Sequence, residues 1–292
     1  MVKRYFIATW VFLFAAFSCP AQISSSNAEA ARRGEGGKET SDKSQKDSAV
    51  VFQKRGLLPF KKSISREQKK TLAPDASDLK NYELFLSQPK TGLIKLLPDL
   101  GCEENSAIVR VDEICLKAIP MSGAFSFREN EYTNDFLSDI RLKNGILITD
   151  GVLIQGVLVA LGDVALETVT AGSDGMKFIN EFVPETQSAE ALKQTTQLVK
   201  GVKSGEFLYR KALPAAENTT YALRLVAYRG RLWQSVHGKP FDMLAGDKRF
   251  DLTLTFRVLK KDEAGSLTLL WKELARKDAP KIIFSKNSKK PF

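Results

Sequence analysis

The feature that most constrains the fold is a strict alternation of apolar and polar residues near the C-terminus. Residues 249–260 read RFDLTLTFRVLK, and this period of two puts the two sets of side chains on opposite faces of a β-strand. One apolar face and one polar face are typical of an antiparallel sheet that is buried on one side and wet on the other. The residues on the expected buried face are Phe250, Leu252, Leu254, Phe256 and Val258.

Other stretches repeat this period and supply partner strands. Residues 267–274, LTLLWKEL, follow a polar turn and have Trp271 in the expected inward set. Residues 218–229, NTTYALRLVAYR, alternate in the same way, and so do 107–119 and 122–128. We expect these stretches to pair as strands around one core.

Two dipeptides indicate tight turns between strands. Asn144-Gly145 and Asp150-Gly151 suit type I′ turns, in which both central residues have positive φ. They predict a meander whose middle strand is only 146–149. Residues 152–161 are apolar on both faces, which predicts a central strand that is covered on both sides.

Two helical segments complete the predicted fold. Residues 75–88 begin with the cap candidates Asp75 and Ser77, and the predicted helix ends before Pro89. Residues 188–203 have an apolar stripe that would cover one sheet face, with Gly205 as the stop. We therefore predict an α+β fold, a predominantly antiparallel β-sheet (sandwich or partly closed barrel) with one or two packed helices. The residues of the predicted stripe are Ala189, Leu192, Thr196, Val199 and Val202.

The first residues have the pattern of a leader. Lys3 and Arg4 precede an apolar run, Ile7–Phe17, that is too short for a bilayer core, which needs about 20 residues. This pattern is typical of a secretory signal peptide, which has a basic start, a short apolar run and small residues before the cleavage site. The expected cleavage is after Ala21. The alternatives are a lipoprotein signal, in which Cys19 is acylated, and an uncleaved anchor. The expected localisation is exported: periplasmic, envelope-associated or extracellular.

Composition divides the rest of the chain. After a signal peptide 1–21 we expect a disordered basic tether 22–74, a single β-rich globular domain 75–284 and a basic flexible tail 285–292. The formal net charge of +10 comes from the flanks; 23–73, for example, holds 12 Lys and Arg against 6 Asp and Glu. Basic flanks can contact an anionic envelope surface, or they can merely keep a protein soluble.

The positive charge is not gathered on one element of the fold, as it usually is in a nucleic-acid binder, so we expect no nucleic acid partner. Nor do we expect a transmembrane segment in the mature chain.

The cysteines add one expectation. Cys102 and Cys115 would remain after removal of the leader, and an even count in an exported protein favours a disulfide. The alternative is that both are small buried apolar residues. With a single histidine in the chain, a four-ligand zinc site lacks partners, so we expect no metal and no cofactor.

Catalytic motifs are largely missing. His237 is the only histidine, and no G-x-S-x-G sequence is present, which disfavours a Ser-His-Asp hydrolase. Paired carboxylates remain possible, because glycoside hydrolysis needs only two Asp or Glu side chains. The oxygen-rich stretch 128–135, RENEYTND, lacks the pattern of a calcium loop, and we expect an exposed polar loop there.

One segment suggests a binding surface. Arg229 and Arg231 flank a glycine just before Trp233, and such a set can stack against a sugar or a peptide. The alternative is that these residues are the rim and core of the β-fold. The other aromatic residues near this segment are Tyr221, Tyr228 and Phe241.

Three functions fit these observations. The first is an exported, non-enzymatic binding or structural protein of bacterial type that contacts a surface component or a ligand of unknown nature. The second is a carboxylate-dependent glycan hydrolase. The third is a lipocalin-like carrier of an apolar small molecule. The lack of histidine and of nucleophile motifs favours the first, so the chain is not expected to be an enzyme.

Overall fold

The fold was analysed in a computed structural model, which describes residues 64–99, 119, 121–236 and 239–284. All of these belong to one compact unit. Several sequence predictions fall outside the described residues: the signal peptide with Cys19, most of the tether, the Cys102–Cys115 pair, His237 and the tail 285–292.

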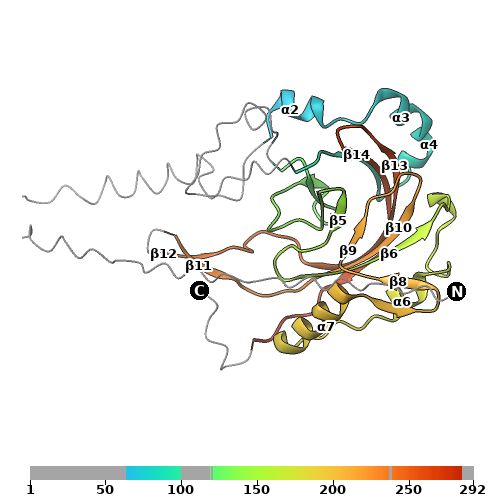
Figure 1. The fold of residues 1–292 in the computed structure, drawn as a ribbon. Helices are drawn as coiled ribbons and strands as arrows, with labels where there is room; N and C mark the ends of the chain where they lie inside the picture. The colour runs from blue at the N-terminus through green and yellow to red at the C-terminus, as the bar shows by residue number, and fades with distance from the viewer. Residues whose placement is uncertain (1–63, 100–118, 120, 237–238, 285–292) are drawn as a thin grey trace, which may run out of the picture. The chain divides into compact units, whose positions relative to one another are not determined.

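The main sheet is antiparallel and has five curved strands (Figure 1). Its order is β1 (Thr91–Leu96), β14 (Leu267–Asp278), β13 (Phe250–Lys261), β10 (Thr220–Ala227) and β6 (Ile154–Gly162). All neighbours in this order are antiparallel. The predicted antiparallel fold class is therefore confirmed. Strands β1 and β6 remain edges, so this sheet does not close into a barrel.

A second antiparallel sheet packs on one face of the first. Its order is β3 (Glu131–Tyr132), β2 (Ala124–Ser126), β4 (Ile140–Lys143), β5 (Ile146–Ile148) and β9 (Ala212–Pro214). The largest hydrophobic cluster holds residues from both sheets, which is the arrangement of a sandwich.

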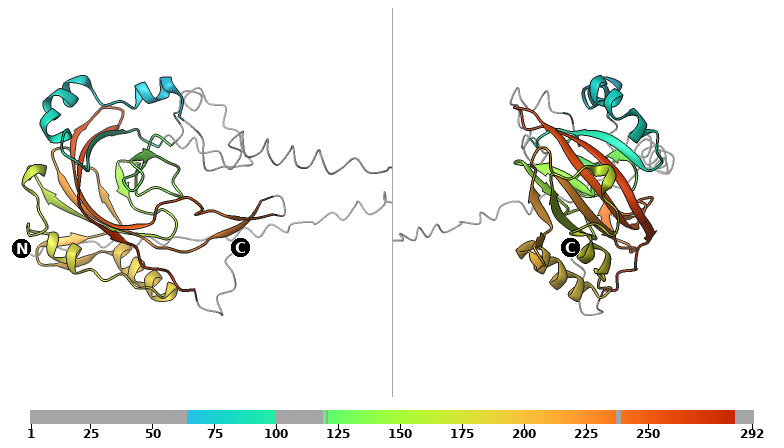
Figure 2. Two further views of the ribbon diagram at one scale, coloured as in Figure 1. Left: turned by 180° about the vertical axis from the view of Figure 1, so that it is seen from behind. Right: turned by 90° about the vertical axis from the view of Figure 1, so that its right-hand side faces the viewer.

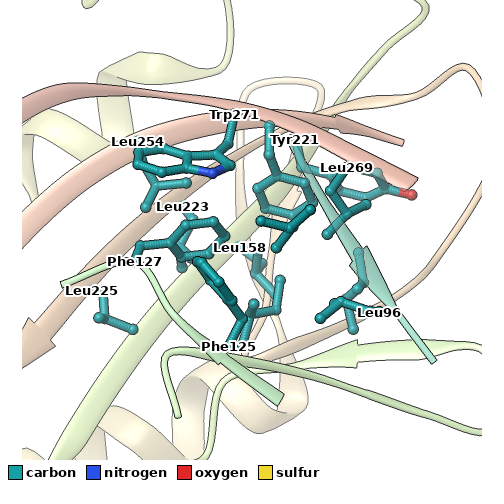
Figure 3. Packing of buried hydrophobic residues seen from close by; sticks show 14 of the residues in the cluster. Leu96, Phe125, Phe127, Leu158, Tyr221, Leu223, Leu225, Leu254, Leu269 and Trp271 are labelled. Carbon is teal, nitrogen blue, oxygen red and sulfur yellow. The ribbon is translucent and has the colours of Figure 1, made fainter. Parts of the chain in front are cut away.

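Side chains fill the space between the two sheets (Figure 3). The rings of Tyr221 and Phe256 stack with centroids 5.2 Å apart, and Phe127 meets Trp271 edge to face at 5.4 Å. Trp271 is only 4% exposed, which confirms its predicted inward position. Burial of these aromatic side chains supplies much of the hydrophobic stabilisation of the fold.

The remaining elements surround the two sheets (Figure 2). Helix α2 lies inside the range 22–74 predicted as tether, and its N-cap Ser65 forms a capping box with Gln68. The described fold thus begins before the expected boundary at Asp75. These elements are α2 (Arg66–Thr71), α3 (Ala76–Asn81), α4 (Glu83–Leu86), a 3₁₀ turn (Leu166–Thr168), α6 (Met176–Glu181), α7 (Ser188–Lys200), β7 (Val202–Ser204) and β8 (Phe207–Tyr209).

One predicted turn is confirmed and the other is wrong. Asn144 and Gly145 have φ of 51° and 74° and join β4 to β5. Asp150-Gly151 does not close a hairpin, because β5 pairs with β9 and β6 crosses to pair with β10 in the other sheet. Strand β6 is buried along most of its length as predicted, but it is an edge strand of the main sheet rather than a central one.

Helix α7 presents a different face from the one predicted. Leu192 and Val199 of the predicted stripe are 67% and 62% exposed, whereas Ala191 and Leu198 are buried. A polar contact helps to fix this orientation, because Gln155 Nε2 donates to Thr195 Oγ1 at 3.2 Å. The helix ends at Gly201, where φ is 102°, rather than at Gly205.

The polar face of β13 is less exposed to solvent than predicted. Asp251 and Thr255 are buried, because α6, α7 and the β7–β8 hairpin pack toward that side of the main sheet with their own apolar cluster. Asp251 accepts a bidentate pair of hydrogen bonds from Arg224 at 3.0 and 2.9 Å. Arg224 Nη1 also donates to the carbonyl of Ile179 at the end of α6, so this buried charge is well satisfied.

Candidate functional site

The candidate site is an exposed two-stranded ribbon, β11 (Trp233–Val236) and β12 (Lys239–Asp242). These strands pair with each other and with no other strand that the structure describes. The ribbon extends away from the main sheet (Figure 1). Trp233, Gln234 and Ser235 are all exposed, so β11 presents its side chains to solvent.

Hydrogen bonds close the base of the ribbon. The Asp242 carboxylate accepts from the backbone N–H of Leu232 at 3.0 Å and of Leu244 at 3.1 Å. The Met243 N–H donates to the Leu232 carbonyl at 2.8 Å. A side chain that bonds neighbouring backbone groups in this way fixes the local turn, so the ribbon leaves the fold in one defined direction.

A buried arginine ties the loop after the ribbon to the second sheet. Arg128 Nε donates to Asp139 at 2.6 Å and Nη1 donates to Asp247 at 2.9 Å. Nη1 also donates to the Lys248 carbonyl and Nη2 donates to the Leu137 carbonyl. The side chains of Arg128 and Asp139 are fully buried. Burial alone would lower the pKa of Arg128, but the charges of Asp139 and Asp247 outweigh it and raise that pKa.

A second arginine completes this buried cluster. Arg249 Nε lies 2.8 Å from Asp247 Oδ2, and Nη1 donates to the Val152 carbonyl at 3.0 Å. Burial lowers the pKa of the Arg249 guanidinium to about 10. Two arginines and two aspartates balance in charge. Their ion pairs connect the segment after the ribbon to the second sheet, so the cluster anchors the ribbon.

The structure places all three predicted binding residues on the surface. Arg229, Arg231 and Trp233 are exposed, and the guanidinium carbon of Arg231 lies 5.8 Å from the centroid of the Trp233 ring. That distance is within the range of a cation–π contact. The predicted neighbours Tyr221 and Tyr228 are buried and take no part in this surface.

Three exposed cations lie near the base of the ribbon. Arg229 forms a parallel backbone bridge with Lys281, whose side chain is also exposed. Within the described part of the chain, no carboxylate forms a salt bridge with Arg229, Arg231 or Lys281. The surface therefore offers three cations and one aromatic face to a partner.

The oxygen-rich stretch 128–135 is engaged in ion pairs. Glu129 pairs with Lys248 at 2.9 Å and Asp135 pairs with Arg141 at 2.7 Å. Among the described residues, no group of three or more His, Cys, Asp or Glu side chains is placed to hold a metal ion.

Sequence reasoning missed the buried cluster. Arg128 and Asp247 are separated by 119 positions, and no local pattern distinguishes either of them from an ordinary surface charge. The only signal was the place of Arg128 at the end of the alternation in 122–128, where it shares a strand face with the small residues Ala124 and Ser126.

Fold and surface together define a predominantly antiparallel α+β protein that presents an exposed ribbon with the cations Arg229, Arg231 and Lys281 near its base. In the described segments, none of the helices has the length and apolarity needed to span a bilayer. No protein-family model matches the chain, and neither a curated protein nor a solved structure matches it significantly.

Proposed function

We propose that this chain is an exported, non-enzymatic binding protein of the bacterial cell envelope or periplasm, and that the β11–β12 ribbon is its binding arm. The leader pattern at the N-terminus supports export. The observation that carries the binding role is the exposed Arg231–Trp233 pair at the start of a ribbon that no other described strand covers. Exposed tryptophan and arginine are the residues most enriched at binding hot spots.

The packed interior supports this function over that of a carrier. A carrier needs a hollow interior, whereas aromatic and aliphatic side chains of both sheets pack against each other here (Figure 3). The arrangement of carboxylates is also consistent with a binding protein. The buried aspartates described above each form an ion pair with an arginine that holds parts of the fold together. They are Asp139, Asp247 and Asp251.

Export is tested by the mass of the mature protein. The full chain is expressed in a bacterium, cells are fractionated, and the intact mass of the product is measured. We expect the protein outside the cytoplasm with its N-terminus at Gln22, or lipidated at Cys19 if the alternative signal operates. An uncleaved chain in the soluble cytoplasmic fraction would overturn the export part of the proposal.

Binding is tested by co-sedimentation of the mature protein with the envelope fraction of its host. The variant Arg231→Ala/Trp233→Ala should lower the sedimented fraction severalfold. The matched control Leu192→Ala/Lys203→Ala also removes one exposed apolar side chain and one exposed cation, and it should leave sedimentation unchanged. Equal sedimentation of both variants would refute the ribbon as the binding arm. Turnover of labelled peptidoglycan by the pure protein would refute the non-enzymatic role.

A further inference from the structure

The hydrogen-bonding register of the ribbon shows which backbone groups of β11 point outward. Trp233 pairs with Asp242 and Ser235 pairs with Pro240. Proline has no N–H, so Ser235 and Pro240 form a pair without mutual hydrogen bonds. The Met243 N–H donates to the Leu232 carbonyl, so these two residues, next to the Trp233–Asp242 pair, form a hydrogen-bonded pair. Hydrogen-bonded and non-hydrogen-bonded pairs alternate along an antiparallel ladder, which makes Trp233–Asp242 a non-hydrogen-bonded pair like Ser235–Pro240. In an antiparallel pair, the N–H and C=O groups of Trp233 and Ser235 therefore face away from β12.

The two edge strands of the main sheet each have an edge position that another segment occupies. On the β1 edge, the Tyr132 hydroxyl donates to the Lys95 carbonyl at 2.7 Å and accepts from the Lys95 N–H at 3.2 Å. On the β6 edge, Leu158 and Arg210 exchange two backbone hydrogen bonds of 2.7 and 2.9 Å. Pro240 removes a donor from the β12 edge. Strand edges are usually blunted in such ways, because an open edge pairs with other chains.

No strand of the described part covers the outer edge of β11. Its side chains at Trp233, Gln234 and Ser235 are exposed. Trp233 and Ser235 lie on one face, with Arg231 stacked beside Trp233, and Gln234 lies on the other face. This edge is therefore an open template of two N–H and two C=O groups next to unpaired positive charge.

We propose that an extended acidic segment of a partner polypeptide adds to the ribbon as a third strand along β11. This inference rests on the proposed binding function and names the partner. Main-chain hydrogen bonds to Trp233 and Ser235 would hold the segment, and its carboxylates would meet Arg229, Arg231 and Lys281. The charge argues against a second copy of this chain, because a second ribbon would bring the same unpaired cations to the edge.

The test uses a backbone change with a matched control. Ser235→Pro deletes one outward N–H and leaves the bonds between β11 and β12 intact, whereas Ser235→Ala removes only the hydroxyl. The probe is an acetylated, amidated octapeptide of alternating Glu and Val, titrated into the mature protein at low salt. Binding is followed by the emission of Trp233, since the other tryptophan of the mature chain, Trp271, is buried. Unchanged far-ultraviolet circular dichroism verifies folding of each variant.

The expected result is saturable binding by the wild type and Ser235→Ala, and affinity roughly tenfold or more lower for Ser235→Pro, as expected for the loss of a backbone hydrogen bond and steric exclusion of the added strand. Arg231→Glu should likewise weaken binding of the acidic peptide. An octapeptide of alternating Lys and Val should not bind the wild type. Hydrogen exchange by nuclear magnetic resonance should show new protection at the amides of Trp233 and Ser235.

Three results would overturn strand addition. They are absence of peptide binding by the wild type, equal affinities of Ser235→Pro and Ser235→Ala, and a concentration-dependent dimer that Ser235→Pro abolishes. If Arg231→Ala/Trp233→Ala still lowers envelope sedimentation while Ser235→Pro does not, the ribbon is a binding arm that uses side chains alone. In that case this inference fails and the proposed function stands.

Discussion

The buried arginine at the base of the ribbon gives the sharpest test of what stabilises this fold. Arg128 and Arg141 each pair with two aspartates, but their burial differs. The Arg128 side chain is fully buried, and its partners Asp139 and Asp247 are 0% and 5% exposed. The Arg141 side chain is 17% exposed, with partner carboxylates that are 44% and 25% exposed. Replacement of each arginine by methionine therefore compares the same kind of ion pair at two depths.

The expected losses of unfolding free energy differ severalfold. Arg128→Met leaves the buried Asp139 carboxyl without its partner, which costs about 3–5 kcal/mol. It also leaves the carbonyls of Leu137 and Lys248 without a donor. Arg141→Met breaks a solvent-screened pair, which costs about 1 kcal/mol or less. A domain of this kind is stable by about 5–15 kcal/mol, so only the first change should threaten folding.

Equilibrium urea unfolding of the mature protein, followed by tryptophan fluorescence, measures both losses. If an unpaired buried charge is the cause, Asp139→Asn in the Arg128→Met background should restore part of the stability. Equal losses for Arg128→Met and Arg141→Met would refute the reasoning, because burial would then have no influence on the cost. An Arg128→Met loss below 1 kcal/mol would refute it as well.

Three further changes test the packing of the core and the helices. Gly92→Ala would place a Cβ 2.7 Å from the Cε2 atom of Trp271, so the free energy of unfolding should fall by about 1–3 kcal/mol in the same urea assay. Leu198→Ala should cost about 2–5 kcal/mol, whereas Leu192→Ala on the exposed side of α7 should stay within about 0.5 kcal/mol; similar losses for both would contradict the observed orientation of the helix. Burial raises the pKa of Tyr132 to about 12, so the neutral phenol stabilises the fold fully below pH 10 and this contribution is lost as the pH rises through 12. In an absorbance titration at 295 nm, Tyr132→Phe should remove one phenolate step near pH 12, and removal of a step near pH 10 instead would contradict this assignment.

The local patterns predicted the strands well. The alternation in 249–260 and 267–274 predicted β13 and β14, and Leu252, Leu254, Phe256 and Val258 are buried as expected. Asn144-Gly145 predicted a turn that depends only on the two residues in it. These features were accessible because a period of two or a demand for positive φ is a property of a few consecutive residues.

Which strands pair with each other could not be predicted from such local patterns. Asp150-Gly151 suggested that β6 would pair with β5, but β6 crosses to the other sheet. The apolar stripe of α7 suggested the wrong buried face, because Ala191, Leu198 and a polar contact of Thr195 orient the helix instead. The sequence shows which apolar residues could be buried. Which of them are buried depends on packing against segments distant in the sequence.

The same distinction applies to the candidate site. The sequence by itself marked Arg229, Arg231 and Trp233 as a candidate surface, and its alternation fixed which residues of each strand share a face. The tertiary structure decided that the ribbon has an open edge, that the second face of β13 is covered, and that Arg128 meets Asp247 across 119 positions. The physical reason is that backbone geometry sets the direction of side chains within an element, whereas burial and charge pairing depend on segments that meet only when the whole chain has folded.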